Sequence, residues 1–189
     1  RTIPELIDAS CETYGDQQAL ADGEIDWSFI KLKQAIHRAA KSLIVTGVKA
    51  GDRVAIWAPN TWEWVVAALG VHVAGAVLVP INTRFKGREA AYVLEQTEAK
   101  ILFTVTDFLD INYVDLLKET DAEENLDEII ILRGNPNQGT TLFSEFTERS
   151  NGCSEEEFSQ RKDAVTGTDL CHIMFTSGTT GAPKGAMLT

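Results

Sequence analysis

Residues 65–81 of this chain read VVAALGVHVAGAVLVPI, which is its longest apolar stretch. The length approaches that of a membrane-spanning helix, which needs about 20 apolar residues. Four residues within the stretch argue against a span, namely Gly70, His72, Gly75 and Pro80. The pattern instead predicts a buried helix over residues 61–73, a turn at residues 74–75 and a buried strand over residues 76–79.

The rest of the chain alternates in the same way between helical and strand patterns. Strands are predicted near residues 54, 77, 101, 129 and 171. Helices are predicted over residues 4–14, 29–46, 61–73, 87–97 and 113–119, and a further helix after Ser154. Ser28 is expected to cap the helix over residues 29–46. Short apolar strands separated by helices predict an α/β fold with a mostly parallel, doubly wound sheet that helices cover on both faces.

Composition and charge limit the classes of partner. The chain has 189 residues, with 17 Lys and Arg against 28 Asp and Glu, and a net charge of −11. Nucleic acids and anionic membrane surfaces attract basic proteins, so neither is expected as the main partner. No transmembrane segment is expected. Any anion that binds here must be held by a local group of residues.

The cysteines indicate a reducing compartment. Cys11, Cys153 and Cys171 are odd in number and lack C-x-x-C spacing. This argues against a disulfide framework and against a zinc site, so we expect a cytoplasmic protein. The first residues, Arg1-Thr2-Ile3-Pro4, lack the basic-then-apolar pattern of a signal peptide, so none is expected in this stretch. Both ends of the sequence are expected to be edges within a longer protein.

Residues 175–185, FTSGTTGAPKG, carry the strongest chemical signal. Four hydroxyl donors stand in five residues, at Thr176, Ser177, Thr179 and Thr180, and Lys184 adds a flexible positive charge. Glycines at 178, 181 and 185 let the backbone approach a ligand closely, and successive N–H groups in such a turn bind anions. Because a strand is predicted immediately before it, the segment would lie at the carboxyl edge of the sheet, where ligands bind. A polyphosphate therefore fits it better than the alternative, a flexible Gly/Ser/Thr-rich linker.

The segment is not a Walker A loop, which requires G-x-x-x-x-G-K followed by Ser or Thr. Here Lys184 is followed by Gly185 and not by Ser or Thr. The glycine that precedes the lysine, Gly181, is three residues away from it and not adjacent. Residues 176–185 instead resemble the phosphate-loop signature of the adenylate-forming superfamily, which includes acyl-CoA synthetases, peptide-synthetase adenylation domains and luciferases. Residues 51–56, 75–82 and 89–103 are similar to other stretches of that family, in the same order. The amino-acid sequence of residues 57–84 is most similar to those of fatty-acyl-CoA ligases and of bacterial ligases for steroid-derived propionates.

The resemblance implies a two-step reaction. A carboxylic acid and ATP would form an acyl-adenylate and pyrophosphate, and coenzyme A would then displace AMP. It implies that Lys184 is the catalytic residue, offsetting charge on the departing pyrophosphate. The phosphates would be bound by Thr176, Ser177, Gly178, Thr179, Thr180, Gly181 and Lys184. ATP, Mg²⁺ and CoA are the implied cofactors, and most of the residues that bind them would lie outside this chain.

The resemblance also implies a partial domain. Residues 1–189 would be the N-terminal portion of an AMP-binding domain: a helical segment with an edge strand over residues 1–50, the parallel sheet over 51–176, and the phosphate loop over 176–185. We expect the isolated chain to be inactive and to self-associate through surface left uncovered. Two alternatives remain open: an adenylation domain that passes the acyl group to a carrier protein, and a non-catalytic nucleotide-binding module. The acid, the acceptor and the oligomeric state are also left open.

Other notable residues favour structural interpretations. His72 and His172 lie in apolar segments, where histidines are usually packed, and neither has a partner at a recognisable spacing. Cys171 and His172 are neighbours in a predicted strand, so their side chains are expected on opposite faces. The tryptophans at 57, 62 and 64 are expected to pack in the core. The acidic residues between 119 and 128 are expected to form a solvated face.

Overall fold

The computed structural model describes residues 1–176 and 183–189 of the chain. The main sheet contains β3 (Arg53–Trp57), β4 (Val77–Pro80), β5 (Ile101–Val105), β6 (Glu128–Arg133), β7 (Thr141–Leu142), β8 (His172–Thr176) and β9 (Lys184–Leu188). The helices are α1 (Ile3–Tyr14), α2 (Phe29–Val45), α3 (Trp62–Val73), α4 (Gly87–Thr97), α5 (Tyr113–Lys118), α6 (Phe143–Glu148) and α7 (Glu155–Asp163). The hairpin of β1 (Gln18–Asp22) and β2 (Ile25–Ser28) and the short 3-10 helices η1 (Ala122–Asn125) and η2 (Arg149–Gly152) complete the elements described.

The sheet is mostly parallel, as the sequence predicted. Its strand order is β7-β6-β5-β3-β4-β8-β9, and β3 lies at its centre with β4 and β5 as parallel neighbours. Two features were not predicted. β9 runs antiparallel to β8 at one edge, and β1 and β2 form a separate two-stranded antiparallel sheet instead of joining the main one.

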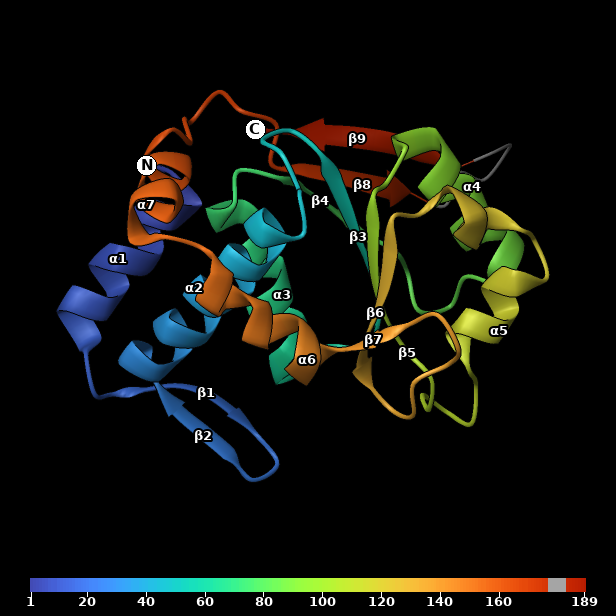
Figure 1. Ribbon diagram of the computed structural model, residues 1–189, viewed down its shortest axis with the longest axis horizontal. Coiled ribbons are helices and arrows are strands. Elements are labelled where there is room, and N and C mark those ends of the chain that lie inside the picture. The colour runs from blue at the N-terminus through green and yellow to red at the C-terminus, as the bar shows by residue number, and fades with distance from the viewer. Residues whose placement is uncertain (177–182) are drawn as a thin grey trace.

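Helices cover both faces of this sheet, which gives three layers (Figure 1). The helices α1, α2, α3, α6 and α7 lie on one side, and α4 and α5 lie on the other. The apolar stretch at residues 65–81 forms most of α3, a turn and β4, so the predicted division of that stretch is confirmed. No helix within the described ranges is long and apolar enough to cross a membrane.

The first layer is built around the pair α2 and α3. Ser28 caps α2 by accepting a hydrogen bond from the Lys31 backbone N–H at 3.3 Å, as the sequence predicted. The two helices approach closely at Gly70, where a Cβ atom would lie 2.8 Å from the Cβ of Ala39. A side chain at position 70 would therefore push the helices apart and open the core between them.

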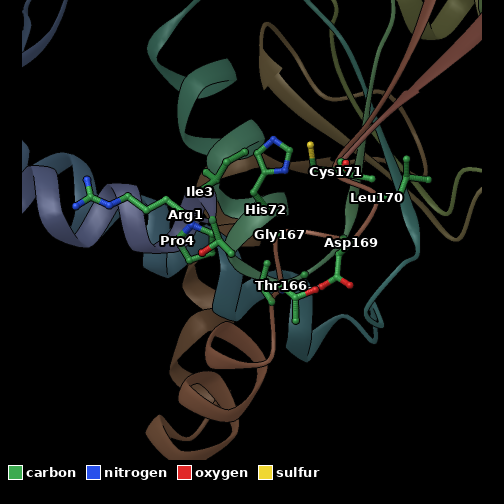
Figure 2. A pocket seen from close by; sticks show the side chains of 14 residues that line it. Arg1, Ile3, Pro4, His72, Thr166, Gly167, Asp169, Leu170 and Cys171 are labelled. Carbon is green, nitrogen blue, oxygen red and sulfur yellow. Dashed lines mark hydrogen bonds between the residues drawn. The ribbon is translucent and has the colours of Figure 1, made fainter.

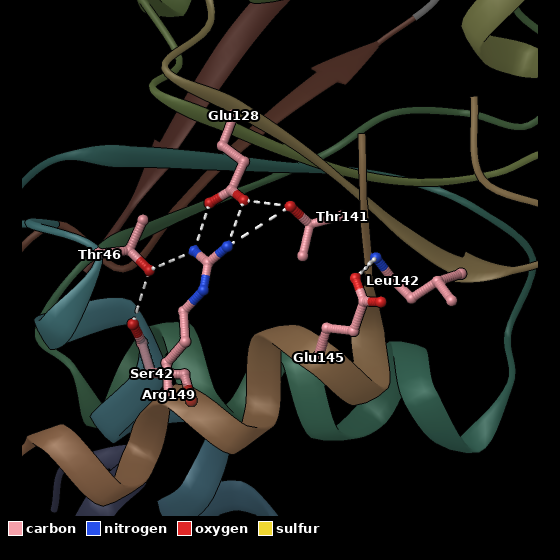
Figure 3. A network of polar contacts seen from close by, with 7 residues as sticks. All are labelled: Ser42, Thr46, Glu128, Thr141, Leu142, Glu145 and Arg149. Atoms are coloured by element: carbon pink, nitrogen blue, oxygen red, sulfur yellow. Dashed lines mark hydrogen bonds and ion pairs between the residues drawn. The ribbon is translucent and has the colours of Figure 1, made fainter. Parts of the chain in front are cut away.

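One ion pair joins segments that are distant in sequence (Figure 3). The Nη1 and Nη2 atoms of Arg149 donate to the carboxylate of Glu128 at 2.7 Å each, and Nη1 also donates to the Thr46 hydroxyl at 3.1 Å. The Thr141 hydroxyl donates to the same carboxylate at 2.5 Å. The network links β6, β7, η2 and the end of α2. The expectation that the acidic run 119–128 is only a solvated face is therefore wrong at its last residue.

The partly buried Glu128 carboxylate remains ionised because of these donors. Burial raises its pKa, but the hydrogen bonds from Arg149 and Thr141 and the charge of Arg149 lower it, and the pKa lies below its ordinary value overall. Arg149 and Glu128 are therefore both charged at neutral pH, and their hydrogen bonds hold η2 against β6.

Candidate phosphate-binding site

The carboxyl end of β8 lies where a ligand-binding loop is expected. β8 pairs in parallel with β4, through Leu78 and His172, so it ends at the same edge of the sheet as β3, β4 and β5. Ligands of open α/β sheets bind at this edge. Thr176 is the last residue of β8, and the glycine- and hydroxyl-rich segment begins there.

The structure brings the two ends of this segment together. Thr176 and Lys184 are register partners in the antiparallel pair of β8 and β9. Directly opposed residues of such a pair have Cβ atoms about 4.5–5.5 Å apart, and both side chains here are exposed. The remaining predicted phosphate ligands lie outside the described residues, and they are Ser177, Gly178, Thr179, Thr180 and Gly181. The described residues thus place a hydroxyl group, from Thr176, and an ammonium group, from Lys184, next to each other at the two ends of the segment.

Lys184 occupies a different kind of element from the one expected. The sequence predicts a loop over residues 176–185, whereas Lys184 is the first residue of β9. Gly185 allows β9 to lie close to β8: a Cβ atom there would lie 3.1 Å from Ile173 Cγ2 and 3.2 Å from Phe175 Cζ. The Phe175 ring thus covers the glycine across the two strands, an arrangement that stabilises glycine in edge strands.

The strand before the segment is less buried than predicted. Its residues alternate between partly buried and exposed. Phe175 contacts Tyr92 of α4 edge-to-face, with ring centroids 6.4 Å apart, whereas Met174 is 47% exposed. Consecutive strand residues face opposite sides of the sheet, so only the side facing α4 is covered here.

A second polar cluster, made of His72, Cys171 and His172, lies at the other end of β8, and Figure 2 shows His72 and Cys171. The rings of His72 and His172 lie 4.6 Å apart at their centroids, tilted by 58°, and Cys171 Sγ lies 3.2 Å from His172 Nδ1. The expectation that Cys171 and His172 point to opposite faces is therefore wrong, whereas the contact between the two rings agrees with the packed position expected of the histidines. Cys171 precedes the strand, which begins at His172, so strict alternation does not apply to the pair.

Burial keeps these imidazoles neutral. Desolvation of His72, together with the charge that His172 would carry, lowers the pKa of His72 to about 4. Burial also lowers the pKa of His172. His72 and Cys171 line a cavity of about 200 Å³ that Figure 2 shows. Among the described residues, no group of three or more His, Cys, Asp or Glu side chains is arranged to hold a metal ion.

The three tryptophans do not form one cluster. Trp57 is fully buried and stacks on Tyr113 at 4.2 Å, and its indole N–H donates to the Asn82 carbonyl oxygen at 3.2 Å. Trp62 instead contacts Trp27 of β2, with ring centroids 4.8 Å apart. Core packing is confirmed for Trp57, and Trp62 and Trp64 are partly buried and pack against the same core.

Comparison with known proteins identifies close relatives of this chain. Residues 7–189 match the protein family described as AMP-binding enzyme. A methyl-dioxo-octahydroindenyl-propanoyl:CoA ligase of Rhodococcus jostii is 35% identical over 98% of this chain and 37% of its own length. A mitochondrial medium-chain acyl-CoA ligase of Mus musculus is 31% identical over 100% of this chain and 33% of its own length. The chain thus spans about a third of the length of these relatives.

Solved structures share the fold. The anthranilate CoA ligase AuaEII in complex with anthranoyl-AMP matches with a TM-score of 0.83 and 22% identity, over 99% of this chain and 34% of that chain. The inhibitor-bound N-terminal domain of FACL13 from Mycobacterium tuberculosis matches with a TM-score of 0.77 and 23% identity, over 99% of this chain and 44% of that chain. At these identities the likeness concerns the architecture of the sheet and its helices.

Proposed function

Because the chain belongs to the AMP-binding enzyme family, we propose that it forms the N-terminal part of an ATP-dependent acyl-CoA ligase. The observation that carries the proposal is the pairing of Thr176 with Lys184 at the carboxyl edge of the sheet. A polyphosphate at this position would meet a hydroxyl donor from one strand and a positive charge from the next. The chain's net charge is −11, so such a local arrangement is what a bound anion requires.

The proposed reaction has two steps. In the first, a carboxylate oxygen forms a bond to the α-phosphorus of ATP, and the bond to the bridging oxygen breaks, so pyrophosphate leaves with the electron pair. In the second, the sulfur of CoA bonds to the acyl carbon, AMP leaves, and the thiol proton passes to solvent. In phosphoryl chemistry of this kind, positioning and charge stabilisation supply most of the rate.

The residues of the loop divide this work. We assign the hydroxyls of Thr176, Ser177, Thr179 and Thr180, with the backbone at Gly178 and Gly181, to the β- and γ-phosphates. Lys184 offsets the negative charge that grows on the departing pyrophosphate. Mg²⁺ would supply further charge neutralisation, and we propose that most of its ligands lie outside residues 1–189.

The relatives support an apolar acid as substrate and CoA as acceptor. The two quoted above are named as CoA ligases for a propanoyl group on a fused ring system and for medium-chain acyl groups. These names favour CoA over a carrier protein. We therefore propose that the acid is a medium-chain fatty acid or a carboxylate on a bulky apolar ring system.

The deciding experiment is exchange of labelled pyrophosphate into ATP by the full-length protein, over a panel of fatty, aryl and polycyclic acids. We expect exchange with one class of apolar acid, followed by thioester formation when CoA is added. A full panel without exchange would defeat the enzymatic proposal, and transfer to a carrier protein but not to CoA would defeat the choice of acceptor. Residues 1–189 alone should form no acyl-CoA.

We place the protein in the cytoplasm, a proposal supported by its free cysteines Cys11, Cys153 and Cys171. One relative carries a mitochondrial designation, so the compartment needs its own test. Fractionation of cells that express the full-length protein should recover it with cytoplasmic markers. Recovery with an organelle fraction would overturn this placement.

A further inference from the structure

A cavity of about 320 Å³ opens between the β1–β2 hairpin, α2, α3, β6 and α6, all of which lie within the described part of the chain. Its volume is at the small end of the range for ligand sites, which is about 300–1,000 Å³. The residues that matter for binding are Trp27, Arg38, Trp62, Glu63, Phe143 and Ser144. They come from four different elements, β2, α2, α3 and α6, and no role in the proposed reaction has been assigned to them.

Aromatic rings form the apolar part of the cavity. Trp27 and Trp62 contact edge-to-face at 4.8 Å, with an interplanar angle of 62°. Trp62 and Phe143 are also edge-to-face, at 6.1 Å and 63°. Both tryptophans are only partly buried, so their rings have surface left to contact a ligand. Such surfaces bind rings and alkyl chains well, because they offer a large apolar area that loses little conformational freedom.

The polar part of the cavity favours an anion. Arg38 is exposed, and in the described residues its guanidinium forms no ion pair. Glu63 also lines the cavity, but its two carboxylate oxygens each accept from Nε of Arg133 at 2.9 Å. Glu63 is therefore already paired, with an arginine that it shares with Asp22. Among the described residues that line the cavity, Arg38 alone is basic, and its charge is left for a ligand.

The walls are held in place before any ligand arrives. Asp22 Oδ2 accepts from the Trp62 backbone N–H at 3.0 Å and from Nη2 of Arg133 at 2.5 Å. These bonds fasten the end of β1 to the start of α3 and to β6. A site that is already ordered loses less entropy on binding, which favours a small ligand.

We propose that this cavity binds a small apolar carboxylate, with its ring or alkyl chain against the aromatic rings of Trp27, Trp62 and Phe143 and its carboxylate on Arg38. The cavity is separate from the strands that carry Thr176 and Lys184. β5, β3 and β4 lie between β6 and β8, and four strand spacings of about 4.8 Å amount to about 19 Å. The inference does not depend on the proposed function, because none of these residues belongs to the loop.

The test uses octanoate as the probe and octanol as its uncharged counterpart. Full-length protein labelled with fluorotryptophan is titrated and followed by fluorine NMR, with the signals assigned through Trp27→Phe and Trp62→Phe. We expect octanoate to shift the signals of Trp27 and Trp62 saturably, while the signal of the fully buried Trp57 stays in place. Octanol should shift them much less at the same concentration.

The variant Arg38→Gln should raise the dissociation constant for octanoate by at least about tenfold, as expected for the loss of a charged hydrogen bond. The control Arg88→Gln removes the same charge from an exposed position on α4 and should leave the affinity unchanged. Arg38→Gln should also leave pyrophosphate exchange intact, which separates this site from the reaction. Unmoved tryptophan signals, equal binding of octanol, or unchanged affinity in Arg38→Gln would each overturn the proposal.

Discussion

Lys184 lies directly opposite Thr176 in the antiparallel pair of β8 and β9, although seven residues separate them along the chain. This pairing brings both ends of the glycine- and hydroxyl-rich segment to one point at the edge of the sheet. A ligand held by the segment would therefore be flanked by an ammonium and a hydroxyl group on ordered strands.

Replacing Lys184 by Ala in the full-length protein should slow adenylation by about 100-fold, the loss typical when one group that stabilises a developing charge is removed. Pyrophosphate exchange measures this step. Thioester formation from preformed acyl-adenylate should change much less, because pyrophosphate has already left. The matched control is Lys31→Ala, at an exposed lysine on α2. An equal loss in both half-reactions would contradict the role of Lys184.

Any side chain at position 185 should disturb the pairing of β8 with β9 and so lower both stability and activity. A Cβ atom there meets Ile173 and Phe175 at 3.1–3.3 Å, so Gly185→Ala should displace the Phe175 ring and shift Thr176 relative to Lys184. We expect unfolding free energy to fall by about 1–3 kcal/mol and pyrophosphate exchange to fall with it. Gly167→Ala is the control, since no atom lies within 4 Å of its Cβ position. Equal behaviour of the two variants would count against close packing of β9 on β8.

The Arg149–Glu128 pair should stabilise the fold only while Glu128 is ionised. Its folded-state pKa lies below the ordinary value, so the unfolded chain takes up the proton first as the pH falls. Glu128→Gln should cost about 1–2 kcal/mol at neutral pH, a value reduced by the partial exposure of the pair. The cost should shrink as the pH falls below about 4, and urea unfolding at a series of pH values measures it. Glu124→Gln, at an exposed acid, should change stability by less than about 0.5 kcal/mol at any pH.

The His72 imidazole should remain neutral in the folded protein down to about pH 4. In the unfolded chain it would protonate near pH 6.5, so folding loses stability as the pH falls between these two values. His72→Leu should remove up to about 1.4 kcal/mol per pH unit from the slope of unfolding free energy in that window. NMR titration of the ring protons gives an independent reading, and a His72 pKa near 6.5 in the folded protein would refute the burial argument.

The isolated chain 1–189 should self-associate through β8 and β9. β9 is the edge strand of the sheet, and Met174, Met187 and Leu188 are 47%, 72% and 46% exposed. An apolar edge strand of this kind readily pairs with another chain. Sedimentation velocity should show concentration-dependent association that Met187→Lys weakens. A chain that stays monomeric at high concentration would contradict the expectation.

The amino-acid sequence determined the elements whose signals are local. The apolar run over residues 65–81 and its interruptions were sufficient to predict α3 and β4, and Ser28 was sufficient to predict the start of α2. Period, capping and turn residues act within a few positions of each other, so they can be recognised without the fold. The short β7 and α6 have no such pattern, and they escaped prediction.

Only the tertiary structure decided which distant residues meet. It brought His72 to His172, Glu128 to Arg149, and Trp62 to Trp27, although none of these pairs follows a helical or strand spacing. It also turned β9 back along β8, which set Lys184 opposite Thr176. The phosphate-binding role of the loop stays a prediction, and it rests on the hydroxyls, glycines and lysine that follow one another in the sequence. Contacts between separate elements depend on how helices and strands pack, and sequence spacing carries no record of that packing.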